Sequence, residues 1–221
     1  MNHINPVLNQ NIIISVDIVM FTIQDDKLKI LLLKRHIEPY IWFWALPGTP
    51  IRQTETAEWS VGRMLYEKLW LSKIYYEQLY TFTWLARDPR NRAVSLSFMS
   101  VSRNFGTPKW EYLTQYHEIK KLPPMAFDHQ EIIRYAYQRL KYKLEYTNIA
   151  QHFLAKYFTL TELQNIYEVI LGYTFDTRNF RKKIKSLNIV KPTGKKQDNV
   201  KNRPAELYEF VNKKLEIKEI L

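Results

Sequence analysis

The chain contains no cysteine among its 221 residues, so disulfide bonds and thiolate metal sites are excluded. It also has no apolar run long enough to cross a bilayer, because the stretch from Ile12 to Phe21 is interrupted by Ser15 and Asp17. No small residues typical of a leader-peptide cleavage site follow that stretch, and internal repeats and low-complexity segments are missing. We therefore expect a globular, cytoplasmic protein without membrane segments, long enough for one large or two small domains.

Acidic residues are in the minority. The sequence has 22 Asp and Glu against 33 Lys and Arg, which gives a formal net charge of +11. Most of this excess lies between residues 176 and 204, where ten basic residues stand against two aspartates, a net charge of +8. So much positive charge in one short stretch indicates an anionic partner such as nucleic acid.

The first part of the chain carries mainly β signals and is expected to form a sheet. The predicted strands span residues 12–22, 27–35, 74–83 and 92–103. The polar turn at residues 24–26 joins the first two as a hairpin. Ala57, Val61, Leu65 and Leu69 recur at every fourth position, which predicts an amphipathic helix packed on this sheet. A second helix, capped by Asp128 and apolar through Leu140, closes the region.

The second part changes from strand to helix periodicity. Helices are predicted at 148–157, at 161–171 and at 176–187, with a capping-box spacing at Thr161 to Gln164, a stop at Gly172 and an N-cap at Asp176. Two strands, 189–193 and 205–210, then flank a basic loop. The order helix, helix, turn, basic helix, basic hairpin is that of a winged helix-turn-helix.

Residues 46 to 71 are similar to a Nudix box, whose helix carries Arg-Glu-hydrophobic-x-Glu-Glu to hold a divalent metal against a pyrophosphate. Here the helix has Arg63 and Glu67 in register, but Met64 and Lys68 replace two of the carboxylates. Lys68 places positive charge where the metal would bind. Thr49 and Trp70 replace glycines, and the Trp is expected to change the backbone of a tight turn. The box predicts a surviving pocket without a catalytic residue, a metal site or hydrolytic activity.

The whole chain resembles the Nudix-related transcriptional regulator family of the NrtR type. Besides the box, the matching segments are 77–82 with 87–90, 122–123 with 126–129, 158–164, 178–183 and 203–208. The resemblance implies an α+β chain, with a Nudix-like α/β/α sandwich and mixed sheet over residues 1–142 and a winged helix-turn-helix over residues 143–221. It also implies a homodimeric repressor that binds a palindromic operator in double-stranded DNA. The small-molecule effector is ADP-ribose in members that control NAD synthesis and a sugar in related branches.

The residues predicted to bind DNA lie on the basic helix and the hairpin that follows it. They are Arg178, Asn179, Arg181, Lys182, Lys185, Lys195, Lys196, Lys201 and Arg203. We expect the helix residues to read bases in the major groove and the hairpin lysines to contact phosphates. The alternative for the helix is a solvated charged face without a partner.

The residues predicted to bind the effector are mainly guanidinium groups, because their fork matches the oxygens of a pyrophosphate. They are Arg35, Arg52, Glu55, Glu67, Arg87 and Arg90, with the two glutamates on ribose hydroxyls. Alternatively, Glu55, Glu67 and Arg63 only tie the box loop to its helix, and residues 87–92 form a solvated turn. His129 is expected to be a structural residue at a helix start.

Two further questions stay open at the level of sequence. The aromatic residues Trp42, Phe43 and Trp44 either stack on an adenine or fill the space that a nucleotide once occupied. For the whole protein, a ligand-responsive DNA-binding regulator that needs no cofactor is favoured. The alternatives are a sugar-responsive regulator, an active Nudix hydrolase, and an effector-free or RNA-binding regulator.

Overall fold

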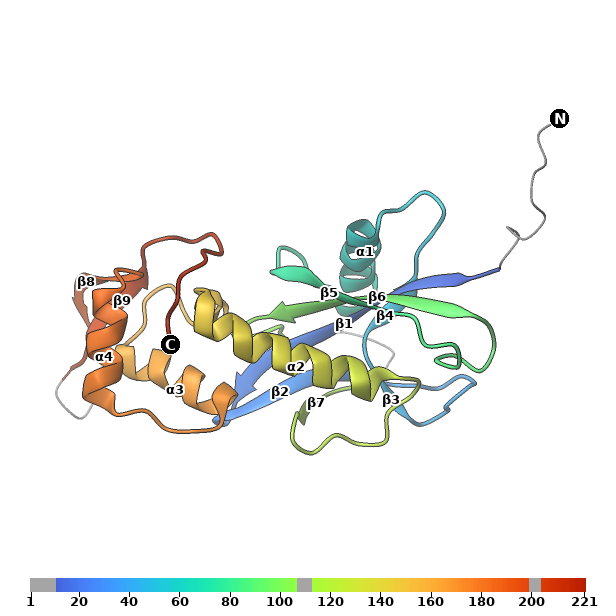
Figure 1. The fold of residues 1–221 in the computed structure, drawn as a ribbon, viewed down its shortest axis with the longest axis horizontal. Coiled ribbons are helices and arrows are strands. Elements are labelled where there is room, and N and C mark those ends of the chain that lie inside the picture. Colours follow the sequence, from blue (N-terminus) through green and yellow to red (C-terminus); the bar gives the residue numbers. More distant parts are fainter. Residues whose placement is uncertain (1–10, 107–112, 199–203) are drawn as a thin grey trace.

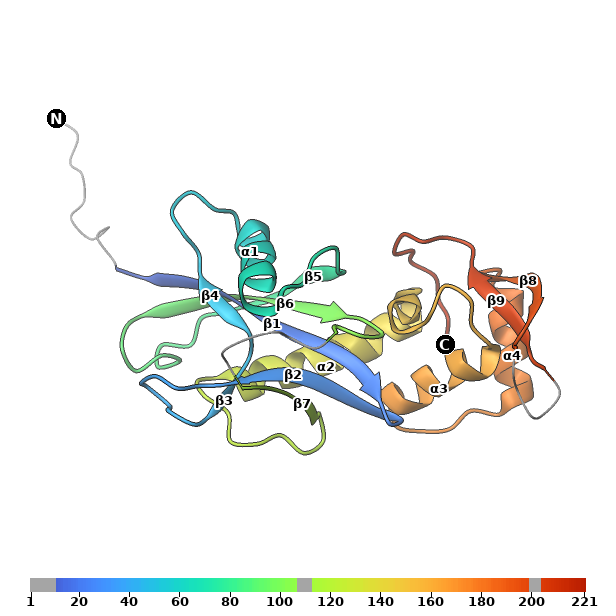
Figure 2. The same ribbon diagram turned by 180° about the vertical axis from the view of Figure 1, so that it is seen from behind.

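The computed structural model describes residues 11–106, 113–198 and 204–221, which form a sheet-based part and a smaller helical part joined through one long helix (Figures 1 and 2). The first part contains β1 (Ile13–Gln24), β2 (Lys27–Lys34), β3 (Trp44–Ala45), β4 (Gly48–Pro50), α1 (Ala57–Leu69), β5 (Tyr76–Phe82), β6 (Ala93–Val101) and β7 (Thr114–Glu118). The long helix is α2 (His129–Tyr146). The second part contains the 3-10 helix η2 (Ile149–Phe153), α3 (Leu160–Leu171), α4 (Thr177–Ser186), β8 (Val190–Lys196) and β9 (Glu206–Phe210).

The sheet is organised around β1, which is buried on both faces along most of its length. Its strand order is β3-β2-β1-β6-β5, with β4 and β7 pairing with β1 and β2. β1 runs parallel to β6 and antiparallel to β2, so the predicted mixed sheet and the predicted hairpin are both confirmed. Asp25 and Asp26 form the hairpin turn with positive φ angles, a conformation that aspartate tolerates better than most residues. β3, β4 and β7 were not predicted, because two or three residues carry no periodic pattern and β7 is largely polar.

A helix covers each face of the sheet, which confirms the expected α/β/α sandwich. Side chains alternate across β1, so Val16 and Ile18 pack with Val61 and Leu65 of α1 in one core. Phe21 belongs to the other core, together with the apolar face of α2. No helix in the described ranges is long and apolar enough to cross a membrane.

The end of α1 differs from the expectation for Trp70. The residue adopts the left-handed conformation (φ 54°, ψ 31°) that favours glycine, and its backbone N–H donates to Leu65 and Tyr66 carbonyls. The box turn is therefore retained, and the prediction that Trp would change it is wrong. The tryptophan side chain is mostly exposed, so no neighbour prevents this backbone geometry.

The second part confirms the predicted winged helix-turn-helix order, with two differences in detail. Only the short η2 forms where a helix over 148–157 was predicted. The capping box of α3 is Thr159 with Glu162, two residues earlier than the predicted pair, because Thr159 precedes the first helical residue. Gly172 ends α3 at φ 85°, and Asp176 caps α4 through the Asn179 backbone N–H, as predicted.

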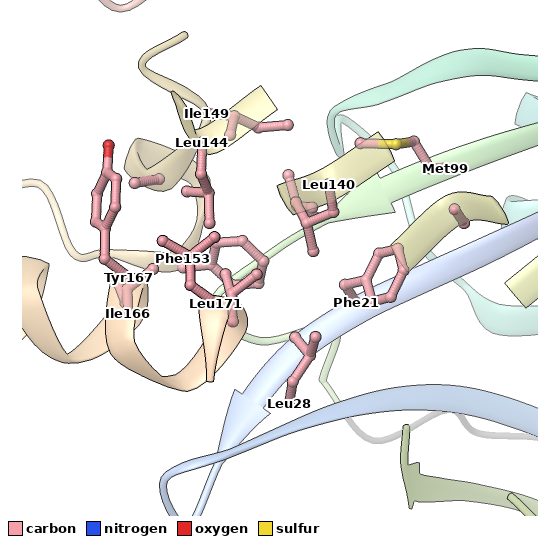
Figure 3. Close-up of a cluster of buried hydrophobic side chains, with 14 of the residues drawn as sticks. Phe21, Leu28, Met99, Leu140, Leu144, Ile149, Phe153, Ile166, Tyr167 and Leu171 are labelled. Carbon is pink, nitrogen blue, oxygen red and sulfur yellow. The ribbon is translucent and has the colours of Figure 1, made fainter. Parts of the chain in front are cut away.

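The two parts share one apolar core. α2 continues through the proposed domain boundary at 142/143 and ends at Tyr146. Phe21 and Leu28 of the sheet, Leu140 of α2, and Ile166 and Leu171 of α3 belong to the same buried cluster (Figure 3). At the surface of this junction, the Asn165 side-chain amide donates to the Asp26 carboxylate of the β1–β2 turn at 2.7 Å. The position of the helical part is thus fixed by the hairpin and by α2.

Shortening Leu140 to alanine tests whether the junction is a single cooperative unit. Leu140 is fully buried in the shared core, so Leu140→Ala is expected to lower the free energy of unfolding by about 2–5 kcal/mol. All six tryptophans lie at or before position 110, so urea melts followed by tryptophan fluorescence report on the sheet-based part. Circular dichroism reports on both parts. We expect both signals to shift together, whereas Gln138→Ala on the exposed face of α2 shifts neither by more than about 0.5 kcal/mol. Separate transitions would show that the parts fold independently.

Candidate functional site

A cleft of about 220 Å³ is lined by the start of β1 and the end of β2, at the opposite end of the hairpin from the turn that contacts α3. Its walls come from β1, β2, β4, the loop before β6 and the start of α2. The polar residues that line it are Ser15, Asp17, Lys34, Arg35, His36, Thr49, Lys68, Arg87, Asp88, Arg90 and His129. Cationic side chains outnumber carboxylates there, which suits an anionic ligand.

A buried charge cluster forms the floor of this cleft. The Arg87 guanidinium donates two hydrogen bonds to Asp128, at 2.9 and 3.0 Å, and a longer one to Asp17 at 3.5 Å. Asp17 also accepts from the Ser95 hydroxyl at 2.6 Å. One sequence prediction changes here, because the Asp128 side chain holds Arg87 instead of capping α2. The alternative of a solvated turn does not hold for Arg87, which is a buried ion-pair partner.

His129 completes the cluster as a neutral imidazole. Its Nδ1 accepts from the Leu46 backbone N–H at 2.9 Å, which places the proton on Nε2, 3.6 Å from the Asp17 carboxylate. Complete burial lowers the pKa of His129, against the attraction of the neighbouring Asp17. Since the ring joins α2 to the segment before β4, the structure supports the interpretation of His129 as a structural residue.

Two guanidinium groups approach one aromatic ring at the rim of the cleft. Arg35 lies 4.8 Å and Arg90 5.7 Å from the centre of the Phe127 ring. Burial and the nearby Arg90 lower the pKa of Arg35. Arg90 is also paired with Asp88 at 2.7 Å and is about half exposed. Of the six residues predicted to bind the effector, Arg35, Arg87 and Arg90 are brought together here.

The other three predicted effector residues form a separate cluster beside the cleft. Arg63 donates to Glu55 at 2.6 Å and to Glu67 at 3.2 Å, while Arg52 lies 3.8 Å from each glutamate. The Arg63 hydrogen bond is the main reason that the pKa of Glu55 falls to about 2. Neither glutamate nor Arg52 lines the cleft. This arrangement supports the alternative that these residues tie the box loop to α1.

The box positions that would hold a metal are occupied by other chemistry. Met64 is fully buried in the core between α1 and the sheet. The Lys68 ammonium points to the cleft and donates to the Gly48 carbonyl at 2.6 Å. Gly48 itself is required, because a Cβ there would lie 2.1 Å from the Asp17 carboxylate oxygen. Within the described residues, no group of three His, Asp or Glu side chains is placed to hold a metal ion.

The aromatic segment before the box does not enter the cleft. Trp42 is 70% exposed, whereas Trp44 is buried with its ring edge-on to His117. Phe43 packs edge-on against Tyr40, which in turn contacts Phe127. Phe127 is thus the aromatic side chain that lines the cleft, and the guanidinium groups of Arg35 and Arg90 lie near its ring at the rim.

The basic face of α4 is directed to solvent. Phe180 and Ile184 are buried, and this leaves the five predicted DNA-contacting residues of the helix on its exposed side: Arg178, Asn179, Arg181, Lys182 and Lys185. Arg181 donates to the Thr161 hydroxyl at the start of α3, at 2.9 Å, so its direction is set by the neighbouring helix. Within the described part of the chain, Arg178 and Lys182 have no side-chain hydrogen bond or ion pair.

Two more of the predicted DNA contacts, Lys195 and Lys196, lie on β8. Lys195 and Lys196 are exposed, and Lys195 lies 4.9 Å from the centre of the Tyr157 ring. Lys201 and Arg203 lie outside the described residues. Exposed cationic side chains therefore lie both on α4 and on β8 of the helical part.

Sequence reasoning missed three side chains of the cleft or gave them another role. Asp17 appeared only as an interruption of an apolar run, although a charged residue within a buried strand is itself a signal of a functional or paired group. Phe127 carried no signal, since its place depends on the chain entering α2. Lys68 was identified as a residue that blocks metal binding, but its contact with Gly48 required the structure.

Comparisons with known proteins agree with this architecture. Residues 150–210 match the family model described as the NrtR DNA-binding winged helix domain. The chain is 32% identical over 207 residues to the ADPR responsive transcriptional repressor NtrR of Acinetobacter baylyi, which covers 90% of this chain and 82% of the relative. It is also 31% identical over 108 residues to an ADP-ribose pyrophosphatase of Methanocaldococcus jannaschii, covering 48% of this chain and 64% of that enzyme.

Two solved structures of Shewanella oneidensis NrtR extend the comparison to three dimensions. The structure complexed with a 27mer DNA is 33% identical and has a TM-score of 0.79, covering 89% of this chain and 93% of that one. The NUDIX domain complexed with ADP ribose is 30% identical with a TM-score of 0.54, covering 62% of this chain and 94% of that one. The chain has the same two-part fold and belongs to the NrtR family of Nudix-related transcriptional regulators.

Proposed function

We propose that the protein is a transcriptional repressor that binds operator DNA through α4 and the β8–β9 hairpin and releases it when ADP-ribose occupies the Nudix cleft. The observation that carries this proposal is that the exposed cationic helix α4 and the cationic cleft belong to two parts of the chain that share one apolar core. The Acinetobacter baylyi relative is named as ADPR responsive, and Shewanella oneidensis NrtR was solved with DNA and, as its NUDIX domain, with ADP ribose. Genes of NAD metabolism are the proposed targets.

The cleft chemistry favours a diphosphate ligand. Among the described residues, Arg35 and Lys68 offer positive charge there without an ion-pair partner, whereas Arg87 is paired with Asp17 and Asp128 and Arg90 with Asp88. A cleft of about 220 Å³ is smaller than the roughly 300–1,000 Å³ of typical ligand pockets, so ADP-ribose would extend beyond it along the rim. A sugar phosphate is the alternative effector, because it fits the volume and uses the same cations.

The described contacts offer a route between the two sites. β1 and β2 line the cleft at the open end of their hairpin. At the other end, Asp26 of the turn accepts a hydrogen bond from Asn165 of α3. A ligand that shifts these strands would shift the position of α4 relative to a second copy. To change the operator from mostly bound to mostly free, the ligand must bind one arrangement of the two α4 helices more tightly than the other, by several kcal/mol. We propose a homodimer on a palindromic operator, in which each α4 reads one half-site about one helical turn, or a multiple of it, from the other.

Fluorescence anisotropy of labelled upstream DNA tests the proposed response. ADP-ribose is expected to lower operator affinity, and the sugar-phosphate alternative predicts release by ribose 5-phosphate instead. Arg90→Ala should preserve DNA binding and blunt the response, because Arg90 is half exposed at the rim. Arg87→Ala is a poor probe, since it would leave Asp17 and Asp128 buried without their cation, at a cost of about 3–5 kcal/mol. Operator binding that neither compound changes would contradict the proposed regulation.

We expect no hydrolysis of ADP-ribose by the purified protein with Mg²⁺ or Mn²⁺. Met64 and Lys68 leave too few oxygen ligands near the cleft for a divalent metal, and Glu67 is paired with Arg63. Product formation followed by chromatography measures this directly. Metal-dependent turnover that Glu67→Gln abolishes would instead identify an active hydrolase.

Two substitutions distinguish base recognition from phosphate contact on the DNA-binding surface. Lys196→Ala, on the exposed hairpin, is expected to weaken binding to operator and random DNA alike and to reduce the salt slope by about one unit. Arg181→Ala is expected to lose roughly 1–3 kcal/mol on the operator only. If Arg181→Ala lowered the affinity for operator and random DNA equally, Arg181 would contact phosphates and not bases. Lys120→Ala, exposed on the sheet-based part, serves as the charge-matched control.

A further inference from the structure

Lys68 is a half-buried cation without an ion-pair partner among the described residues. The side chain lies in the wall of the cleft, and its hydrogen bond is to a neutral acceptor, the Gly48 carbonyl. Among the described carboxylates, none lies within ion-pair distance of this ammonium. The nearest candidates are engaged elsewhere, since Glu67 pairs with Arg63 and Asp17 with Arg87. Burial lowers the pKa of Lys68, against the attraction of the nearby Asp17. A partly desolvated ammonium without an ion-pair partner is stabilised when an anion completes the site.

The position of Lys68 defines which anion would complete it. The residue stands where a Nudix box has a carboxylate that holds a divalent metal against a pyrophosphate. An ammonium carries three N–H donors, of which one is used by Gly48, so two remain for phosphate oxygens. The remaining box residues cannot restore a metal site, because Met64 is buried in the core and Glu67 is held by Arg63. The positive charge that a metal would bring is therefore already built into the chain.

The rest of the cleft is arranged in agreement with this role. Arg35 and Arg90 both lie near the Phe127 ring at the rim, where Arg35 also donates to the Pro39 carbonyl and Arg90 to Asp88. Gly48 allows the chain to approach Asp17 closely and presents its carbonyl to Lys68, which fixes the ammonium in the wall. A diphosphate placed between Lys68 and the rim would meet cations from two sides.

We propose that the Lys68 ammonium replaces the divalent metal of the Nudix box in binding the diphosphate of the ligand, which makes ligand binding independent of metal. This inference rests on the proposed function, because it concerns how the same cleft recognises a nucleoside diphosphate. Lys68 is then a specificity-determining residue, because it allows the cleft to bind a diphosphate without the metal that hydrolysis needs. It also explains why the loss of box carboxylates is compatible with a binding site.

Calorimetric titration with ADP-ribose tests the inference, in EDTA and in MgCl₂. The wild-type dissociation constant is expected to be the same in both buffers. Lys68→Met keeps the length of the side chain and removes its charge, and it should weaken binding by about 10- to 100-fold in both buffers. Lys120→Met, an exposed lysine away from the cleft, should leave the affinity unchanged. Lys68→Glu should bind weakly in EDTA and recover part of the affinity in MgCl₂.

The outcomes separate this inference from the proposed function. Wild-type binding that requires Mg²⁺, or Lys68→Met binding as tightly as wild type, would overturn the role of Lys68 and leave ADP-ribose as the effector. Absence of wild-type binding in both buffers would refute the effector assignment and, with it, the role of Lys68. Operator affinity without ligand and the thermal unfolding of each variant establish that the fold is intact. In Lys68→Met, operator affinity is expected to be unchanged and the unfolding temperature no lower, because the loss of the hydrogen bond to Gly48 is offset by the removal of a partly desolvated charge.

Discussion

The β1–β2 hairpin is the constraint on which the rest of the molecule depends. β1 is buried on both faces, and roughly 23 Å of strand separates Asp17 in the cleft from the turn that holds α3. The same strand supplies Phe21 to the core shared with α2 and α3. Because side chains in such a core are close-packed, we expect a change at the cleft to affect the junction. The hairpin links the cleft to the helical part by packing and by one polar contact.

Charge decides the chemistry of the cleft. Arg87 pairs with both Asp17 and Asp128, so three residues from distant segments stabilise one another in the floor of the cleft. Arg35 and Lys68, together with the half-exposed Arg90 beside its partner Asp88, remain to attract an anion. In an active Nudix box the carboxylates of the helix attract a metal, which then binds the phosphates. Here the helix itself supplies a cation, and the cleft is suited to binding an anion and not to activating water.

Much of the architecture could be predicted from local patterns, whereas the cleft could be predicted only in part, since Arg35, Arg87 and Arg90 line it and the other three predicted effector residues do not. The hairpin, α1 and the winged helix follow from periodicity and from caps such as Asp176 and Gly172, which act within one turn of the chain. Trp70 shows the limit of such rules, because an exposed side chain tolerates a backbone that glycine favours. The contacts of Arg87 depend on residues 41 and 70 positions away in the sequence. Separations of that kind leave no periodic signal in the sequence. Only the structure therefore shows which predicted effector residues line the cleft and which belong to the Arg63 cluster.

Reciprocal linkage is the most direct test of the central claim that the cleft and the recognition helix are coupled. If ADP-ribose lowers operator affinity by a given factor, saturating operator must weaken ADP-ribose binding by the same factor. Calorimetry of ADP-ribose binding with and without operator duplex measures that factor. The account predicts a weaker affinity in the presence of operator, and Asn165→Ala, which removes the contact with Asp26, should reduce the difference. An ADP-ribose affinity that saturating operator leaves unchanged would contradict it.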